Sequence, residues 1–525
     1  MMTPLFTGSD WTPELLARVT DEISRICDEE LHLDCFPIHI CTITAEQMLD
    51  AYAMDGMPMN YAHWSYGKRF LLNRRQYERG RMGLAYEIVS NTSPCQVYCM
   101  EENSMTMQTL VIAHAGFGHN HFFKNNDLFK QWTDPTAILD YLKFSRDLVA
   151  QYEETHGVDE VQDFLSACHA WAPYGVDRYK RPHPLSVKHE KERMRARAQQ
   201  IQENLNALWR FIPDGKAEKD EKAEKVFPEE PQENILYFIE KNAPNLPVWK
   251  RELVRIVRKE AQYFRPQMLT KVMNEGFATF THHYVMTRLW EKDLITDSSY
   301  QEFLVDHTNV IFQPGFNETR RVLRGHDKDG KPIVEDVPIY KGVNPYALGF
   351  AMFTDIKRIC ESPTEEDRRW FPALAGTPWL EGVKWAAENF SDKTFMGQYL
   401  SPKVIRDFKL FALHDDDNEE EYIVSAIHDD DGYQDVRDVL AGMYDVNNIL
   451  PSIQVVEVDL RKTRSLLLRH ESHKRKRLDR EQTEASLLLL HKLWEFPVEL
   501  RTISVDGSLV DIWKCEDGEN VIHRG

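Results

Sequence analysis

The chain has 525 residues, of which 42% are hydrophobic and 28% are charged, and its formal net charge is −20 at pH 7. This length and apolar content predict several domains with buried cores and exclude a globally disordered chain. Because an acidic chain repels nucleic-acid phosphates, we expect no nucleic-acid partner.

The cysteines and the N-terminus bear on the cellular compartment. Eight cysteines are spread along the chain, which is too sparse for a disulfide framework and favours a reducing compartment. The first residues lack the basic and apolar regions of a signal peptide. No run of 18 uninterrupted apolar residues is present, so we expect a cytoplasmic protein without a transmembrane segment.

Residues 1–400 are predicted to form a large, mostly helical domain. The stretch SDWTPELLARVTDEISRICDEEL (9–31) opens with a Ser/Asp cap and has a proline in its first turn, and its apolar residues recur at helical spacing. Thr44 is the expected N-cap of the next helix. Helical cores are also expected in YEIVSNTSP (86–94) and SMTMQTLVIAHA (104–115), and convincing strand patterns are almost absent before residue 400.

A charged, low-complexity stretch, DGKAEKDEKAEKVFPEEP (214–231), interrupts this domain. Its composition and its prolines are typical of a linker or an exposed loop. Helical patterns resume after it, for example in QMLTKVMNEGFATFTHHYVMTRLWEKDLI (267–295).

The pattern changes after residue 402. Short runs of β type alternate with two helices in the order β-β-α-β-β-α-β-β, and the last two strands form a hairpin around Asp506 and Gly507. We therefore expect a small α+β domain over residues 401–525. The predicted fold class is mainly α, with a large helical N-terminal domain and this small C-terminal domain.

Three histidines lie within eight residues in LVIAHAGFGHNHFFKNN (110–126). On an ideal helix His114 and His121 share a face, but His119 lies about 140° from His114, which is poor for joint metal ligation. If His114 and His119 share a metal, the helix must bend or bulge near residues 116–118, where glycines permit it. Two interpretations stay open: a metal or catalytic site, or histidines that bridge buried backbone groups at a bend.

A second polar group stands in the apolar helix pattern NEGFATFTHHYVM (274–286). Glu275 and His282 are seven residues apart and therefore share a helix face. A carboxylate buried among apolar residues needs a partner, because burying it unpaired is expensive. A metal ion or one of the upstream histidines would supply that partner, and a core Glu–Arg pair is the alternative.

Three carboxylates precede the histidine stretch. Glu87 lies in an apolar run, and Glu101 and Glu102 lie near a predicted helix start. Each is a candidate general base or a further metal ligand. Helix capping is the alternative interpretation for each of them.

Four segments, in order, carry a family resemblance that covers nearly the whole chain. MPMNYAHWSYGKRF (57–70), YEIVSNTSP (86–94), AHAGFGHNHFFKNN (113–126) and NEGFATFTHHYVM (274–286) together resemble the stage V sporulation protein R (SpoVR) family. The resemblance implies a link to spore-cortex formation and, in bacteria that do not sporulate, to stress or stationary phase. It also implies action together with a PrkA-type serine kinase and a von Willebrand-type protein.

A weaker, local similarity bears on chemistry. NEGFATF is similar to the N-E-G-x-A segment of gluzincin metallopeptidases, whose glutamate is the third zinc ligand, and this similarity implies Glu275 as a ligand beside His114 and His119. The chain departs twice from the H-E-x-x-H motif that precedes this segment in those enzymes. Its two histidines are five residues apart, and Ala115 stands where the catalytic glutamate would be. Another carboxylate would then have to act as the general base.

Two functional hypotheses follow. The first is a hydrolase acting on a peptide or a cell-wall-type amide, in which His114, His119 and Glu275 bind zinc or a similar divalent metal. In this hypothesis His121 or His282 is a further ligand or an orienting group. The second is a non-enzymatic regulatory or scaffold protein that acts with the kinase and its partner.

Overall fold

The chain divides into two compact units, residues 1–166 with 252–450 and residues 167–251 with 451–525. The structure is a computed structural model. It describes residues 3–54, 57, 60–78, 86–178, 227–315, 318–326, 331–340, 342–410, 412–414, 423–425, 429–459, 462–472 and 477–525. Residues 214–226 of the expected charged linker lie outside the described residues.

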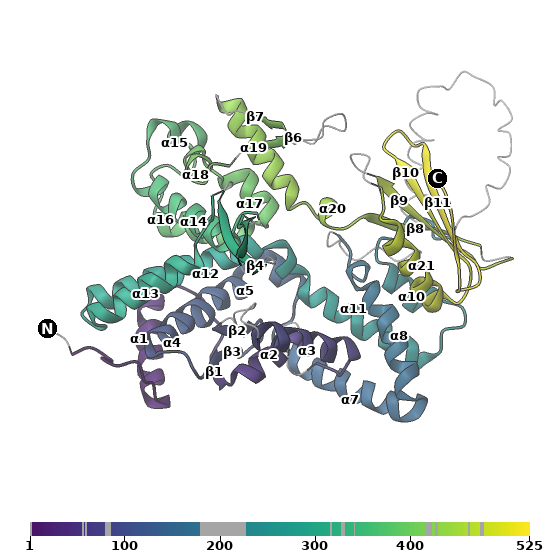
Figure 1. Cartoon of the computed structure of the whole chain (residues 1–525), viewed down its shortest axis with the longest axis horizontal. Coiled ribbons are helices and arrows are strands. Elements are labelled where there is room, and N and C mark those ends of the chain that lie inside the picture. Colours follow the sequence, from purple (N-terminus) through teal and green to yellow (C-terminus); the bar gives the residue numbers. More distant parts are fainter. Residues whose placement is uncertain are drawn as a thin grey trace, which may run out of the picture. The chain divides into compact units, whose positions relative to one another are not determined.

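The first unit is mainly helical (Figure 1). Its described helices are α1 (Pro13–Glu29), α2 (Ala45–Ala53), α3 (Trp64–Glu78), α4 (Met105–Val111), the π-helix η1 (Ile112–His119), α5 (Asn120–Asn125), α6 (Asp127–Trp132), α7 (Ile138–His156), α12 (Lys271–Glu291), α13 (Asp297–Val310), α14 (Pro345–Glu361), α15 (Glu365–Trp370), α16 (Trp379–Asn389), α17 (Asp392–Tyr399), α18 (Pro402–Asp407), α19 (Asp430–Met443) and α20 (Val446–Ile449). Two further helices, α8 (Val158–Ala170) and α11 (Val248–Leu269), contribute residues to both units.

The predicted cap of α2 is confirmed, whereas the N-cap of α1 is Thr12 and not the expected Ser9 or Asp10. The side chain of Thr12 accepts a hydrogen bond from the backbone N–H of Leu15, and Pro13 occupies the first turn of α1. Thr44 and Gln47 form a capping box at the start of α2, in which each side chain bonds the other residue's backbone N–H. The predicted helix starts are therefore confirmed to within a few residues.

Strands before residue 400 correct one expectation from the sequence. Strands β1 (Ile38–Ile43), β3 (Cys95–Met100) and β2 (Glu87–Ser90) form a sheet in that order, with β1 parallel and β2 antiparallel to β3. Strands β4 (Thr319–His326) and β5 (Pro332–Pro338) form a hairpin. The expectation that strands are almost absent here, and that YEIVSNTSP is helical, is wrong, because these short strands are stabilised by pairing between distant segments and not by local propensity.

The second unit contains the β-rich part of the C-terminus. Its elements are η2 (Ala172–Tyr174), α10 (Ile235–Asn242), β8 (Ser452–Val458), β9 (Leu466–Ser472), α21 (Arg480–Trp494), β10 (Val498–Ser504), β11 (Leu509–Cys515) and β12 (Val521–Arg524). The sheet order is β12-β11-β10-β9-β8, and α21 forms the crossover between the parallel strands β9 and β10. The fold class is thus confirmed as mainly α with a small α+β region at the C-terminus.

Helix α12 packs against both α14 and η1. A Cβ on Gly276 would lie 2.4 Å from backbone atoms of Gly349 in α14, and a Cβ on Gly118 would lie 2.6 Å from Cα of Ala278. The absence of side chains at these positions therefore lets three helical segments approach at backbone contact distance. Asp392 accepts hydrogen bonds from the backbone N–H groups of the first turn of α12, which satisfies two donors there.

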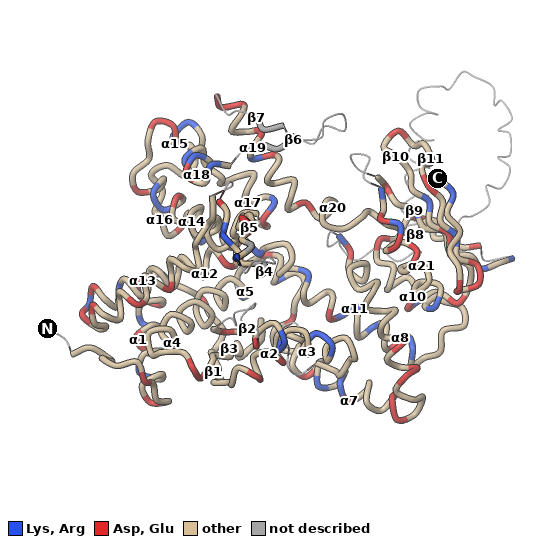
Figure 2. Tube along the Cα trace, viewed as in Figure 1, with Lys and Arg blue, Asp and Glu red and all other residues tan. Residues whose placement is uncertain are grey.

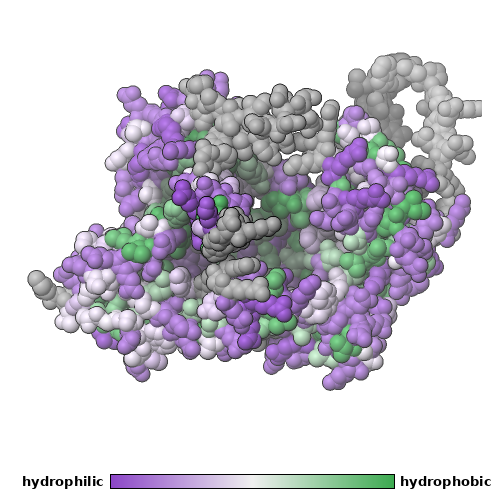
Figure 3. All heavy atoms as spheres, viewed as in Figure 1, coloured by the Kyte–Doolittle hydropathy of each residue, from purple (hydrophilic) through white to green (hydrophobic). Residues whose placement is uncertain are grey.

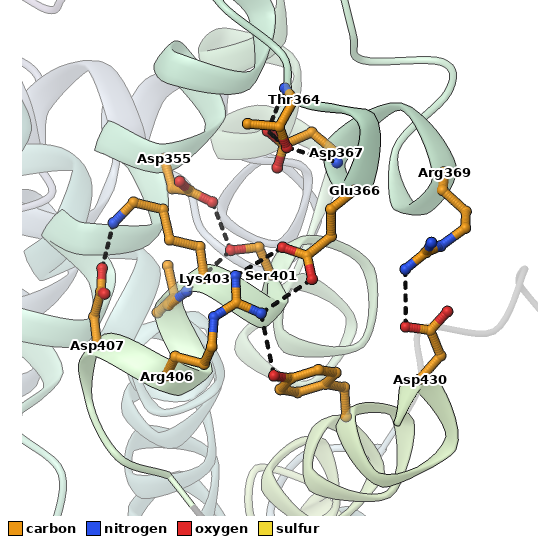
Figure 4. A network of polar contacts seen from close by, with 12 residues as sticks. Asp355, Thr364, Glu366, Asp367, Arg369, Ser401, Lys403, Arg406, Asp407 and Asp430 are labelled. Atoms are coloured by element: carbon orange, nitrogen blue, oxygen red, sulfur yellow. Dashed lines mark hydrogen bonds and ion pairs between the residues drawn. The ribbon is translucent and has the colours of Figure 1, made fainter. Parts of the chain in front are cut away.

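A buried polar network ties α14 to α15 and α18 (Figure 4). Ser401 donates a hydrogen bond of 2.6 Å to Asp355 on α14. Arg358 forms ion pairs of 2.7 Å with both Asp355 and Asp367. The Arg358 guanidinium holds the pKa of Asp367 well below its usual range. These bonds hold α15 and α18 to α14, the helix that packs against α12.

The described surface is mostly hydrophilic in the view of Figure 3. Among the described residues, no helix is both long and apolar enough to cross a membrane.

Substituting Gly276 tests the close helix crossing. Gly276→Ala places a methyl group on the backbone of Gly349, so we expect a loss of about 2 kcal/mol or more in the free energy of unfolding. The control is Gly67→Ala in the exposed helix α3, where a Cβ would meet nothing within 4 Å and is expected to stabilise by up to about 1 kcal/mol. Urea unfolding measures both, and equal stability of the two variants would contradict the crossing.

Candidate metal centre

The π-helix η1 brings His114 and His119 to one face. Hydrogen bonds from residue i to i+5 widen the turn, so residues five apart in sequence come round to the same side. The two imidazole rings are 4.6 Å apart between centroids, and both are buried. The π-helix spans residues 112–119, which confirms the predicted bulge near residues 116–118.

Glu275 on α12 faces the two histidines across the η1–α12 contact. Its Oε2 lies 3.4 Å from Nε2 of His119 and 3.7 Å from Nε2 of His114. One ligand atom from each of the three residues lies within 4.8 Å of the others. Two imidazole nitrogens and one carboxylate oxygen therefore point at a common volume.

Glu87 reaches the same volume from the sheet. It is the first residue of β2, where it pairs with Cys99, and its Oε1 lies 3.8 Å from Nε2 of His114. The strand that the sequence pattern missed thus positions the second carboxylate.

The far sides of both histidine rings are hydrogen-bonded. Nδ1 of His119 lies 2.8 Å from Oδ1 of Asn274, and because an amide oxygen only accepts, the neutral His119 ring carries its proton on Nδ1 and presents a lone pair at Nε2. Nδ1 of His114 lies 2.9 Å from Nδ1 of His282, whose Nε2 lies 2.9 Å from Nδ1 of His307. Such partners orient histidines that bind metals.

Burial and the neighbouring charges shift the pKa values of these groups in opposite directions. Burial raises the pKa of Glu275, but His119 and His114 outweigh this effect and hold it well below its usual range. Burial lowers the pKa of His119, but Glu275 and the bond to Asn274 outweigh this effect and raise it above the usual value. Burial raises the pKa of Glu87, and the nearby histidines offset only part of that shift. One carboxylate therefore stays ionised while the other is a better proton acceptor.

Sequence reasoning missed Tyr346, which lies beside this cluster. Its ring stacks near that of His114, with 6.3 Å between centroids and 18° between planes. Burial raises the pKa of Tyr346, and the carboxylates of Glu275 and Glu87 raise it further, so the hydroxyl keeps its proton. Tyr346 is in the first turn of α14, more than 200 residues from the histidines, and no local motif marks it.

Other residues singled out from the sequence are not among the three whose ligand atoms converge. His121 is buried, its Nδ1 accepts from the backbone N–H of Asp34, and its Nε2 lies 3.7 Å from Glu388. Glu101 and Glu102 are exposed in the turn after β3. His282 touches the cluster only through Nδ1 of His114, where it orients that ring. The structure thus brings together Glu87, His114, His119 and Glu275.

Comparison with known proteins assigns the family. The family model described as "SpoVR like protein" matches residues 10–449, and the one described as "SpoVR-like C-terminal domain" matches residues 451–505. The chain belongs to the SpoVR family. It is similar to "Uncharacterized protein YcgB" of Escherichia coli (strain K12), with 49% identity over 513 residues that cover 98% of this chain and 96% of that protein. No solved structure matches this SpoVR chain.

The donor set of this SpoVR chain fits a divalent transition metal. Two imidazoles with one carboxylate form a ligand set that zinc and similar ions accept. Oε2 of Glu275 is buried. Nε2 of His119 lies 3.4 Å from it, and this nitrogen carries a lone pair when the ring is neutral and then donates no hydrogen bond to Oε2. A cation between Glu275 and the two Nε2 atoms would satisfy it.

The pair of Glu275 and His119 predicts a titration in protein freed of metal by a chelator. Because its pKa is raised, His119 keeps its proton at pH values where a free histidine, near 6.5, has lost it. The pair therefore adds stability below the unfolded pKa, and this stability is lost as the pH rises through the folded pKa. NMR of the imidazole protons measures the titration.

Glu275→Gln removes the charge that raises this pKa, so we expect the titration of His119 to move to lower pH. His121 is the internal control, because burial lowers its pKa to about 4 and Glu275 has no part in that shift. A His119 ring that is neutral at pH 6 in the wild-type chain would contradict the pairing.

Proposed function

We propose that this SpoVR-family chain is a metal-dependent hydrolase whose centre consists of His114, His119 and Glu275, with zinc or another divalent metal as cofactor. The observation that carries the proposal is the convergence of their three donor atoms within 4.8 Å. The second support is that the far nitrogen of each ring already has a partner, so each Nε2 is oriented toward the shared volume.

The surrounding residues suit hydrolysis. A bound divalent ion supplies Lewis acidity, which polarises a carbonyl group and favours loss of a proton from water. Glu87, whose pKa burial raises, accepts that proton at a carboxylate oxygen and later returns it to the leaving group. Tyr346 keeps its hydroxyl proton and donates a hydrogen bond to the carbonyl oxygen as negative charge develops there.

These residues would catalyse hydrolysis as a gluzincin does, but with the ligands and the general base on different elements. In the H-E-x-x-H motif one helix supplies both histidines and the general base. Here Ala115 leaves no base on the helix, and the carboxylate comes from strand β2 instead. The π-helix places residues i and i+5 on one side, as an α-helix places residues i and i+4.

The family resemblance suggests the substrate and the setting. We propose a peptide or a cell-wall-type amide as substrate, and a cytoplasmic role in stress, stationary phase or spore-cortex formation. A PrkA-type serine kinase and a von Willebrand-type protein are the proposed partners. The alternative function, a scaffold for these partners, requires no bound metal.

Metal analysis of purified protein tests the centre. We expect about one divalent ion per chain in the wild type, and at least tenfold weaker binding in Glu275→Ala because one of three ligands is lost. Glu101→Ala is the matched control, since it removes an exposed carboxylate outside the cluster, and it should keep the metal. A folded wild type without metal would exclude the hydrolase and leave the scaffold function.

Glu87→Gln separates catalysis from metal binding. We expect this variant to keep its metal and to lose about 10²- to 10⁴-fold in the rate of amide hydrolysis, because the amide side chain cannot accept a proton. Release of amino groups from a peptide mixture measures the rate, with Glu102→Gln as the control for an exposed carboxylate. An unchanged rate in Glu87→Gln would assign the base to another group.

A further inference from the structure

Helix α3 carries large apolar side chains in solvent. Trp64, Leu71 and Leu72 are 56%, 56% and 54% exposed, and Tyr66 is the buried residue of the helix. Single exposed apolar residues are ordinary, whereas a contiguous apolar patch is typical of a contact surface. The metal centre does not use this helix.

Two cations lie on the same side of α3 as these apolar residues. At 100° per residue, Trp64, Lys68, Leu71, Leu72 and Arg75 fall on one side of the helix, and we call these five residues the α3 face. Among the described residues, no carboxylate forms an ion pair with Lys68 or Arg75, whereas Arg74, outside the face, pairs with Glu78 and Glu46. The face thus offers positive charge interleaved with apolar surface in a chain of net charge −20; basic residues along α3 appear in Figure 2.

The face is held in place from its first residue. The backbone N–H of Trp64 donates to Oε1 of Gln162, and its indole Nε1–H donates to Oγ of Ser166 at 2.8 Å. These bonds fix the indole ring of a residue that is 56% exposed. A surface oriented before binding loses less conformational entropy when a partner docks.

We propose that the α3 face docks an acidic, amphipathic helical segment of a partner protein. Leucine-type side chains of such a segment would cover Trp64, Leu71 and Leu72, and its carboxylates would pair with Lys68 and Arg75. The seven-residue spacing of the two cations matches two turns of a helix lying alongside α3.

The positions of Lys68 and Arg75 favour an acidic helix over a second copy of the chain or a membrane surface as the occupant of the α3 face. Two copies of the chain that met through the same face would oppose like charges, which disfavours a symmetric dimer. A helix that lies in a membrane surface separates its apolar and basic faces, whereas Lys68 stands between Trp64 and Leu71 on one face and would be drawn into the apolar layer with them.

Peptide binding to the full-length protein tests the proposal. The probe is a labelled synthetic helix with leucine on one face and glutamate flanking it, and the comparison peptide has lysine in place of glutamate. We expect the acidic peptide to bind with Kd on the order of 10 µM at low salt and at least tenfold tighter than the basic one. Fluorescence anisotropy measures both.

Two charge reversals locate the contact. The double variant Lys68→Glu with Arg75→Glu should weaken acidic-peptide binding by at least about fivefold. The matched control, Arg18→Glu with Arg25→Glu on α1, changes the net charge equally at the same seven-residue spacing and should bind as the wild type does. Leu71→Ser with Leu72→Ser should also weaken binding while the salt dependence persists.

Other outcomes overturn the proposal. Absence of acidic-peptide binding, equal affinity for the basic peptide, or equal loss in the α1 control would show that the α3 face is not an acidic docking site. Binding to vesicles of anionic lipid that the α3 reversal abolishes, without peptide binding, would assign the face to a membrane surface. Circular dichroism of each variant confirms that the exposed substitutions leave the fold intact.

Discussion

The carboxylate of Glu275 is the constraint on which the centre of the first unit depends. It lies among apolar residues of α12, where an unpaired charge would cost several kcal/mol or more. His119 and His114 meet it at 3.4 Å and 3.7 Å, and the attraction outweighs burial, since the pKa of Glu275 falls despite it. The contact at Gly118 makes this meeting possible, because it lets η1 approach α12 at backbone distance, and the contact at Gly276 does the same for α14, which carries Tyr346.

Local signals in the sequence predict much of the fold. Helical spacing locates α1 and α2, and the alternation after residue 402 predicts the order β8, β9, α21, β10 and β11, although it misses β12 and the short helices α18 and α20. The strands β1, β2 and β3 escape such reasoning because each is only four to six residues long. They exist because β3 pairs with partners from two other segments, and register of that kind is a property of the tertiary fold.

The candidate site, like the fold, could be predicted from the sequence only in part. His114, His119 and Glu275 are chemically unusual by their residue types and spacing, which the sequence shows directly. Asn274 stands next to Glu275, yet its contact joins residues 155 positions apart. Tyr346 and His307 lie in helices without a motif, so only packing shows that they belong to this neighbourhood. The residues that could donate ligand atoms can thus be recognised in the sequence, whereas long-range contacts decide which groups orient them.

The π-helix η1 is a segment whose backbone conformation is set by tertiary packing and not by local helix propensity. Eight residues with π-type hydrogen bonds are unusual, since most π segments are single-turn bulges within α-helices. Local propensity therefore does not account for η1, which packs against the distant elements α12, α1 and β2 and against β3. If this segment were an α-helix with Gly118 still against α12, the side chain of His119 would point away from Glu275. The carboxylate would then lack its nearest imidazole. The rare π geometry is offset by pairing a buried charge, and π segments are frequent at functional sites.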